Sequence, residues 1–197
     1  MFNIAVFASG SGSNFQAILD STTQNGILSD ATICGLITNK AEIKAIDRAH
    51  SAGIEAVVLN PSVYPTAREY EASLLSTLEI WNTDLIVLAG YLRKIPVSVI
   101  DRYPNRILNI HPSLLPRFGG KGFYGMKVHK AVKEAGDHET GCTIHIVTEE
   151  FDDGPILAQE RITISLSDSA EEIAARVLTL EHDLYPRVIA SHMKSLT

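Results

Sequence analysis

The chain has 197 residues, a formal net charge of -6 at pH 7 and a pI near 5.6, and 45% of its residues are hydrophobic. A folded chain of this length buries roughly 70% of the surface that its unfolded form exposes, so we expect one well-filled core. The composition excludes disordered, fibrous and membrane proteins. Because the chain is acidic, we also expect no nucleic-acid partner.

The cellular location is predicted from cysteine usage and from the N-terminal segment. Cys34 and Cys142 both lie in apolar, strand-like runs, which is typical of buried thiols in a reducing compartment. The start MFNIAVFASGSG lacks the basic region and the longer apolar stretch of a signal peptide, and no run of about 18 apolar residues occurs. We therefore expect a cytoplasmic protein with no membrane partner. The histidines show no metal-ligand spacing, so we expect no metal.

The first half of the chain alternates apolar runs with segments of helical spacing. The predicted strands are residues 2–8, 32–38, 56–59 and 85–89, and the predicted helices start near Phe15 and cover residues 43–52 and 68–81. The run LIVLA at residues 85–89 is continuous rather than alternating, as expected of a strand that is covered on both faces. This alternation predicts βαβ crossovers and hence a doubly wound, mostly parallel sheet with helices on both sides.

The second half adds an antiparallel edge and a closing helix. RILNI at residues 106–110 predicts a strand and residues 126–135 predict a helix. CTIHIV and PILAQERI flank FDDG like the two arms of a hairpin, so we expect antiparallel strands at the far edge of the sheet. Ser169 and Glu172 form a capping box, after which one helical face runs up to Pro186 through Ile173, Val177, Leu180 and Leu184.

The glycine turn SGSGSN follows the first strand, where an open α/β sheet places its ligand. Gly10 and Gly12 permit positive φ, and the N–H groups of Gly12, Ser13 and Asn14 can converge on an anion at the helix N-terminus. The third glycine of a dinucleotide fingerprint is missing, and no Gly-Lys-Ser/Thr closes a P-loop. Two interpretations therefore stay open: a phosphate site, or a tight turn with Ser or Asn as the helix cap.

Two further motifs, LNIHPSLLP and FDDGP, contain polar groups near strand ends. Asn109 can donate a hydrogen bond to an oxygen that gains negative charge, and His111 can hold or pass a proton. Asp152 or Asp153 can supply the carboxylate that orients such a histidine. From the residues alone, a histidine before proline is more often structural, and Asp-Asp-Gly-Pro is also an ordinary turn.

SGSGSN, NIHPSLLP and FDDGP, in this order, resemble the motifs of phosphoribosylglycinamide formyltransferase, the folate-dependent family of purine synthesis, from Phe2 to about Val188. The resemblance implies a Rossmann-like fold in a single domain, 1–197, with a phosphate-binding half (1–100) and a catalytic, folate-binding half (101–197). It implies that the amine of glycinamide ribonucleotide attacks the formyl carbon of the co-substrate 10-formyltetrahydrofolate, without a metal. We expect a monomer or weak homodimer.

The resemblance also implies a role for each matching residue. The implied catalytic residues are Asn109 as donor to the formyl oxygen, His111 as stabiliser of that oxygen and proton carrier, and Asp152 as the group that orients the imidazole. The implied ribonucleotide contacts are Gly12, Ser13, Asn14 and Glu181. The implied folate contacts are Arg68, Leu92, Arg93, Lys94, Ile95 and Asn109. Without the resemblance, Glu181 is a solvated helix residue and Arg68 a helix-surface charge.

The sequence departs from the family pattern in one segment and at one position. The segment FGGKGFYGMKV at residues 118–128 is longer and richer in glycine than in some members of the family, and we favour a lid over a merely flexible loop. In a lid, Lys121 would reach the substrate. Leu178 stands where some members have a polar residue near the sugar. His145 falls on an alternating strand, so we interpret it as structural.

Other functions remain as alternatives. Methionyl-tRNA formyltransferase carries an additional C-terminal domain and needs basic surface, and the formyl-folate hydrolase carries an additional N-terminal domain. The length of this chain and its acidity favour neither. A non-catalytic nucleotide-sensing module would use the glycine turn alone, and Asn109, His111 and Asp152 argue against it.

Overall fold

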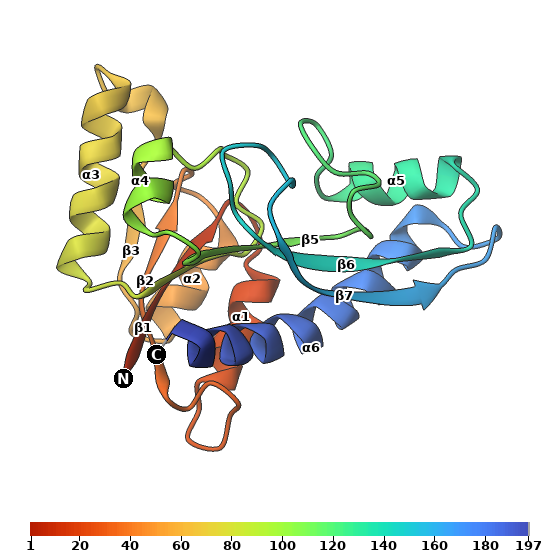
Figure 1. Cartoon of the computed structure of the whole chain (residues 1–197), viewed down its shortest axis with the longest axis horizontal. Helices are drawn as coiled ribbons and strands as arrows, with labels where there is room; N and C mark the ends of the chain where they lie inside the picture. Colours follow the sequence, from red (N-terminus) through yellow and green to blue (C-terminus); the bar gives the residue numbers. More distant parts are fainter. Residues whose placement is uncertain (197) are drawn as a thin grey trace.

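The computed structural model is built around one seven-stranded sheet (Figure 1). It describes residues 1–196, so Thr197, the last residue of the predicted domain, lies outside the described residues. The spatial order is β3-β2-β1-β4-β5-β6-β7. Strands β1 to β5 are parallel, and β6 and β7 are antiparallel to their neighbours. The strands are β1 (Phe2–Ala8), β2 (Ala31–Thr38), β3 (Ala56–Val58), β4 (Leu85–Leu88), β5 (Ile107–His111), β6 (Glu139–Ile146) and β7 (Ile156–Thr163). The predicted parallel sheet with an antiparallel edge is confirmed.

Helices pack on both faces of this sheet, as predicted. They are α1 (Ser13–Ser21), α2 (Lys44–Ser51), α3 (Ala67–Ile80), α4 (Val97–Arg102), α5 (Met126–Glu134) and α6 (Ala170–Leu196), with a 3-10 turn η1 (Pro61–Val63). Side chains of α3 and α4 pack with Ala5 and Phe7 of β1, whereas side chains of α1, α2, α5 and α6 pack with Ile4 and Val6. The strand alternation thus divides the core into two layers. In the described chain, no helix is long and apolar enough to cross a membrane.

The structure adds two elements that were not predicted and extends a third. Helix α4 has six residues and η1 three, too short to produce a clear apolar period. Helix α6 begins with the predicted capping box, in which the Glu172 N–H donates to Ser169 Oγ at 3.2 Å and the Ser169 N–H donates to Glu172 Oε2 at 2.7 Å. The helix then continues beyond Pro186, because Ile189 and Met193 are buried on the same face. The burial of these side chains offsets the helix hydrogen bond that is lost because Pro186 has no N–H.

The carboxyl ends of three adjacent strands meet at the point where the chain reverses its direction of winding, between β1 and β4. Ser9 follows β1, Gly90 follows β4, and His111 ends β5. The Ser9 N–H donates to the Gly90 carbonyl at 3.1 Å, which joins the first two ends. Ligands of doubly wound sheets bind at such a switch point.

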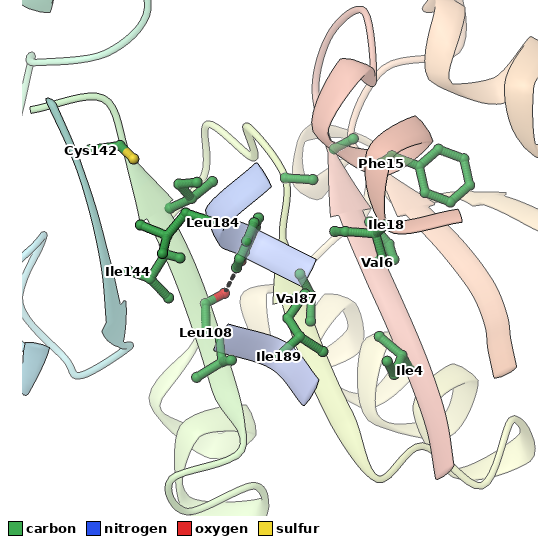
Figure 2. Packing of buried hydrophobic residues seen from close by; sticks show 14 of the residues in the cluster. Ile4, Val6, Phe15, Ile18, Val87, Leu108, Cys142, Ile144, Leu184 and Ile189 are labelled. Atoms are coloured by element: carbon green, nitrogen blue, oxygen red, sulfur yellow. Dashed lines mark hydrogen bonds between the residues drawn. The ribbon is translucent and has the colours of Figure 1, made fainter. Parts of the chain in front are cut away.

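Alternation along β5 determines which of its side chains reach this edge. Leu108 and Ile110 belong to the layer that contains α6, and Figure 2 shows Leu184 and Ile189 of α6 beside Leu108, Ile144 and Val87. Asn109 therefore faces the opposite side of the sheet, together with Ile107. The same alternation places His111 on the side of Asn109.

Tyr185 of α6 is a polar anchor within the apolar layer. Its hydroxyl lies 3.1 Å from the carbonyl oxygens of both Leu88 and Leu108, so its proton can be donated to either strand. A dashed line in Figure 2 marks the bond to the Leu108 carbonyl. Burial greatly raises the pKa of Tyr185, so the phenol stays neutral.

We predict that Tyr185→Phe lowers the free energy of unfolding by about 1 to 3 kcal/mol, because two buried carbonyls lose their shared donor. Urea denaturation measures the change. Tyr64→Phe is the control, since no described residue hydrogen-bonds the Tyr64 hydroxyl, and it should shift the midpoint little. Equal effects of the two substitutions would contradict this account of Tyr185.

Candidate active site

A cavity of about 590 Å³ opens at the switch point. This volume suits a small-molecule ligand. Nine of the predicted site residues line it: Asn14, Leu92, Arg93, Lys94, Ile95, Asn109, His111, Asp152 and Glu181. Gly12 and Ser13 immediately precede the lining residue Asn14. Arg68 is exposed on α3 and does not line the cavity, and neither does Leu178 of α6.

The three predicted catalytic side chains meet in the cavity. Asn109 Nδ2 donates to Asp152 Oδ1 at 3.3 Å, and His111 Nδ1 lies 3.4 Å from Asp152 Oδ2. The amide and the imidazole thus approach the two oxygens of one carboxylate. Asp153, the other acid of the motif, is exposed, so the structure selects Asp152 between the two.

The proton-bearing nitrogen of His111 is identified by its partners. His111 Nε2 lies 2.8 Å from the Phe118 carbonyl, which can only accept, so Nε2 carries a proton. The ring is 4% exposed, and this burial lowers the pKa of His111 although Asp152 and the Phe118 carbonyl act to raise it. Burial thus favours the neutral ring, whereas the carboxylate that Nδ1 faces favours the imidazolium with a proton on each nitrogen.

Asp152 is held ionised in a strained turn. Burial acts to raise the pKa of its carboxyl group, but His145, His111 and the N–H of Gly120 outweigh burial and hold the pKa below its usual range. The Gly120 N–H donates to Asp152 Oδ2 at 2.9 Å. Asp152 itself has a φ of 55°, which is uncommon for a residue with a side chain. Such conformations recur at functional sites.

His145 is a member of this cluster that the sequence interpretation missed. It pairs with Asn109 in the β5–β6 register, and its Nε2 lies 3.1 Å from Asn109 Nδ2. Its Nδ1 lies 2.9 Å from the Ile146 carbonyl and therefore carries a proton, and its Nε2 also lies 3.5 Å from Asp152 Oδ1. His145 orients the amide, and its position opposite Asn109 was hidden because the register was not predicted.

Glu181 is buried rather than solvated, which overturns the interpretation from its sequence context alone. It is 6% exposed and accepts a hydrogen bond of 2.7 Å from Asn14 Nδ2. Burial raises the pKa of Glu181 to about 7, and the Asn14 bond lowers it only in part. Asn14 Oδ1 is buried without a partner among the described residues, although Asn14 lines the cavity. That oxygen is available to a donor on a ligand.

The glycine turn presents a helix terminus that no side chain caps. Gly12 is the N-cap of α1 with φ 70°, and no side-chain cap hydrogen bond is present. The alternative of a Ser or Asn cap is therefore wrong. The uncapped N–H groups keep the positive end of α1 available to an anion.

The predicted folate wall, residues 91–95, lies along one side of the cavity. The Leu92 N–H donates to Ser9 Oγ at 3.0 Å, so it is not available to hydrogen-bond a pterin. The wall faces residues 147–152, and Lys94 Nζ lies 3.9 Å from Glu150 Oε1 across the mouth. Residues 120–125, including Lys121, form another part of the lining. Among residues 1–196 no cluster of acid, cysteine or histidine side chains could hold a metal.

Comparisons with known proteins identify the family of the chain. The family model described as formyl transferase matches residues 2–189. The chain belongs to the formyl transferase family. It is 38% identical to the phosphoribosylglycinamide formyltransferase of Escherichia coli, with 95% of this chain and 85% of that protein covered. The crystal structure of glycinamide ribonucleotide transformylase 1 from Geobacillus kaustophilus superposes with a TM-score of 0.89 at 38% identity, covering 97% of this chain and 98% of that one.

A plant member of the family is longer than this chain. The chloroplastic phosphoribosylglycinamide formyltransferase of Arabidopsis thaliana is 44% identical over 194 residues, which are 95% of this chain and 64% of that protein. The chain thus spans less than two thirds of that relative.

We predict that Glu181→Gln flattens the pH dependence of stability. The folded pKa of Glu181, about 7, lies above its unfolded value of 4.5, so its contribution is fully present below pH 4.5 and is lost as the pH rises through 7. Relative to the variant, the wild type should lose about 2 kcal/mol between pH 5 and pH 8. Urea denaturation across this range measures the difference.

Glu171→Gln is the matched control, because Glu171 is exposed on the same helix. Its pH profile should follow that of the wild type. Parallel profiles for the wild type and the Glu181 variant would mean that Glu181 is ionised at neutral pH.

Proposed function

We propose that this chain transfers the formyl group of 10-formyltetrahydrofolate to the amine of N1-(5-phospho-D-ribosyl)glycinamide. The products are the N-formyl ribonucleotide and tetrahydrofolate, in purine biosynthesis. The observation that carries the proposal is the approach of Asn109 and His111 to the two oxygens of Asp152, inside a cavity that also contains Asn14 and Glu181.

The reaction needs one new carbon–nitrogen bond and the loss of another. The substrate amine attacks the formyl carbon, the carbonyl electrons move onto its oxygen, and the bond to the folate nitrogen then breaks. Asn109 donates to the oxygen while it is negative, a contact worth about 3 to 4 kcal/mol in other enzymes. Its Nδ2 is held by Asp152 Oδ1 and lies 3.1 Å from His145 Nε2, so the bond to the formyl oxygen replaces one of these two contacts.

The same step releases a proton from the amine and requires one at the departing folate nitrogen. His111 carries it in its imidazolium form: Nε2 gives its proton to the folate nitrogen and regains one from the amine, while the Nδ1 proton stays at Asp152. Asp152 stabilises the imidazolium that forms, because its ionised carboxylate lies 3.4 Å from His111 Nδ1. For His111 Nε2 to meet the formyl oxygen, it must exchange its bond to the Phe118 carbonyl for that oxygen.

The ribonucleotide would occupy the side of the cavity formed by α1 and α6. Its phosphate would accept from the uncapped N–H groups at Gly12, Ser13 and Asn14. Its glycinamide or ribose end would donate to Glu181 and to the unpartnered Asn14 Oδ1. The family resemblance supports this placement.

The folate would occupy the side formed by residues 91–95 and 147–152. Backbone groups of Arg93, Lys94 and Ile95 and the Leu92 carbonyl would hydrogen-bond its pterin. Because Arg68 lies outside the cavity lining, it would meet only the glutamate tail where the folate leaves the cavity. Residues 118–125 would close over the pair as a lid.

Two further parts of the proposal concern the state of the protein. We propose a cytoplasmic location, which the buried or half-buried free cysteines favour. We also propose a monomer or weak homodimer. Gel filtration at micromolar concentration tests the second part.

The reaction is tested by mixing the purified chain with glycinamide ribonucleotide and 10-formyltetrahydrofolate and following loss of the formyl group. We expect N-formyl ribonucleotide only when both substrates are present. Formate release without the ribonucleotide would favour a hydrolase, and formylation of methionyl-tRNA would favour the tRNA enzyme. Either result, without formation of the N-formyl ribonucleotide, would overturn the proposal.

We predict that His111→Ala and Asp152→Asn each reduce kcat by about 100-fold or more, because proton transfer loses its carrier or its orienting charge. Their affinity for the ribonucleotide should change little. Asn14→Ala should mainly weaken that affinity. His192→Ala serves as the control, since His192 lies outside the cavity lining and its Nε2 hydrogen-bonds the Asn105 carbonyl. Proportionate losses of kcat and affinity in all three variants would contradict the assigned roles.

A further inference from the structure

The phosphate loop, residues 9–14, contains no charged side chain, since its sequence is SGSGSN. A phosphate monoester carries nearly two negative charges at neutral pH. Helix N-terminal N–H groups supply only about half a positive charge. A cation from another segment would therefore complete the site.

Arg48 of α2 lies directly against this loop. Its Nε donates to the Ser11 carbonyl at 3.0 Å, and its Nη1 donates to Gln16 Oε1 at 2.9 Å. The guanidinium thus ties the middle of the loop to the first turn of α1. Burial and then the charge of Arg48 lower the pKa of the neighbouring His182, so His182 is neutral near pH 7 and does not replace that charge.

The first turn of α2 fixes the loop at two more points. The Ala45 N–H donates to the Gly10 carbonyl at 3.3 Å. A Cβ atom at Gly12 would lie 2.8 Å from the Ala45 Cβ, so the loop backbone and α2 are in close contact. The carbonyls of Gly10 and Ser11 therefore both point toward α2.

Because peptide bonds are planar, the contact of the Gly10 and Ser11 carbonyls with α2 also determines the direction of the neighbouring N–H groups. A trans peptide directs its carbonyl and its N–H to opposite sides. With the Gly10 and Ser11 carbonyls held by α2, the N–H groups of Ser11 and Gly12 point away from it. Within the described residues neither N–H donates to a partner, so both are available to a ligand.

From these contacts we infer that Arg48 is the positioning residue of the phosphate loop and the source of its compensating positive charge. This inference rests on the proposed binding of a ribonucleotide phosphate. Arg48 acts on the phosphate through the Ser11 carbonyl and through its charge. It does not line the cavity and does not touch the reacting atoms.

The test measures binding by calorimetry with two ligands, glycinamide ribonucleotide and its dephosphorylated nucleoside. Arg48→Ala should weaken ribonucleotide binding roughly 10- to 100-fold, because a charge-assisted bond and a cation are lost. Nucleoside binding and the KM for the formyl folate should stay within about twofold of the wild type, which a general loss of structure would not allow. Arg48→Lys keeps the charge but not the fork of donors and should bind the ribonucleotide with intermediate affinity.

Arg106→Ala is the matched control. Arg106 is also a half-buried arginine that donates to a backbone carbonyl, from Nη1 to Asp84 O at 3.1 Å, but it lies at the opposite end of the sheet. Its loss should leave the affinities for both ligands unchanged. If Arg48→Ala does not fold, Arg48→Lys and Gln16→Ala are compared with the wild type in the same way.

Equal weakening of nucleotide and nucleoside in the Arg48 variants, or no weakening of either, would overturn the inference. Failure of the proposed reaction has a different signature. A wild-type chain that binds the ribonucleotide in an Arg48-dependent way but forms no formylated product would keep the loop assignment and refute the transfer.

Discussion

The site depends on one ionised carboxylate that lines the cavity. Asp152 is mostly buried, and a buried charge is tolerated only with close polar partners. Its partners come from three segments: Asn109 and His111 on β5, His145 on β6, and Gly120 in the glycine-rich loop. The carboxylate thus fixes the loop, the amide and the imidazole relative to one another. Gly154 permits this turn, because a Cβ there would lie 1.7 Å from the Ile146 carbonyl.

The register of β5 with β6 determines whether these partners can meet. Asn109 pairs with His145, and His111 pairs with Thr143. A slip of one residue would turn Asn109 and His111 toward the layer under α6 and would expose Leu108 and Ile110 to the cavity. The apolar contacts of Leu108 and Ile110 with α6 therefore also hold the polar site in place.

Local patterns were sufficient to predict the strands, the crossovers and the position of each motif, because period, glycine turns and caps are encoded by neighbouring residues. They were not sufficient to pair Asp152 with His111 or to recognise His145, because both depend on the register of strands that are distant in the chain. Glu181 did carry a usable signal. It stands four residues after Val177 and three before Leu184, on the buried stripe of α6, where a solvated glutamate is not expected. The sequence interpretation gave its polar neighbours more weight than its period.

Two carboxyl groups of the same cavity are held in opposite states by their surroundings. Asp152 has several partners that favour its charge, so its pKa is low, whereas among residues 1–196 Glu181 has only Asn14 to offset burial, so its pKa rises to about 7. Such a divergence separates roles: a permanent negative charge beside His111, and a group near neutrality that can respond to the ligand. Ser9 links the phosphate loop to the folate wall. It begins the loop, and its Oγ accepts from the Leu92 N–H and donates to Asn39 Oδ1. The start of the phosphate loop and the start of the folate wall are therefore fixed to one buried serine, and neither can shift without moving the other.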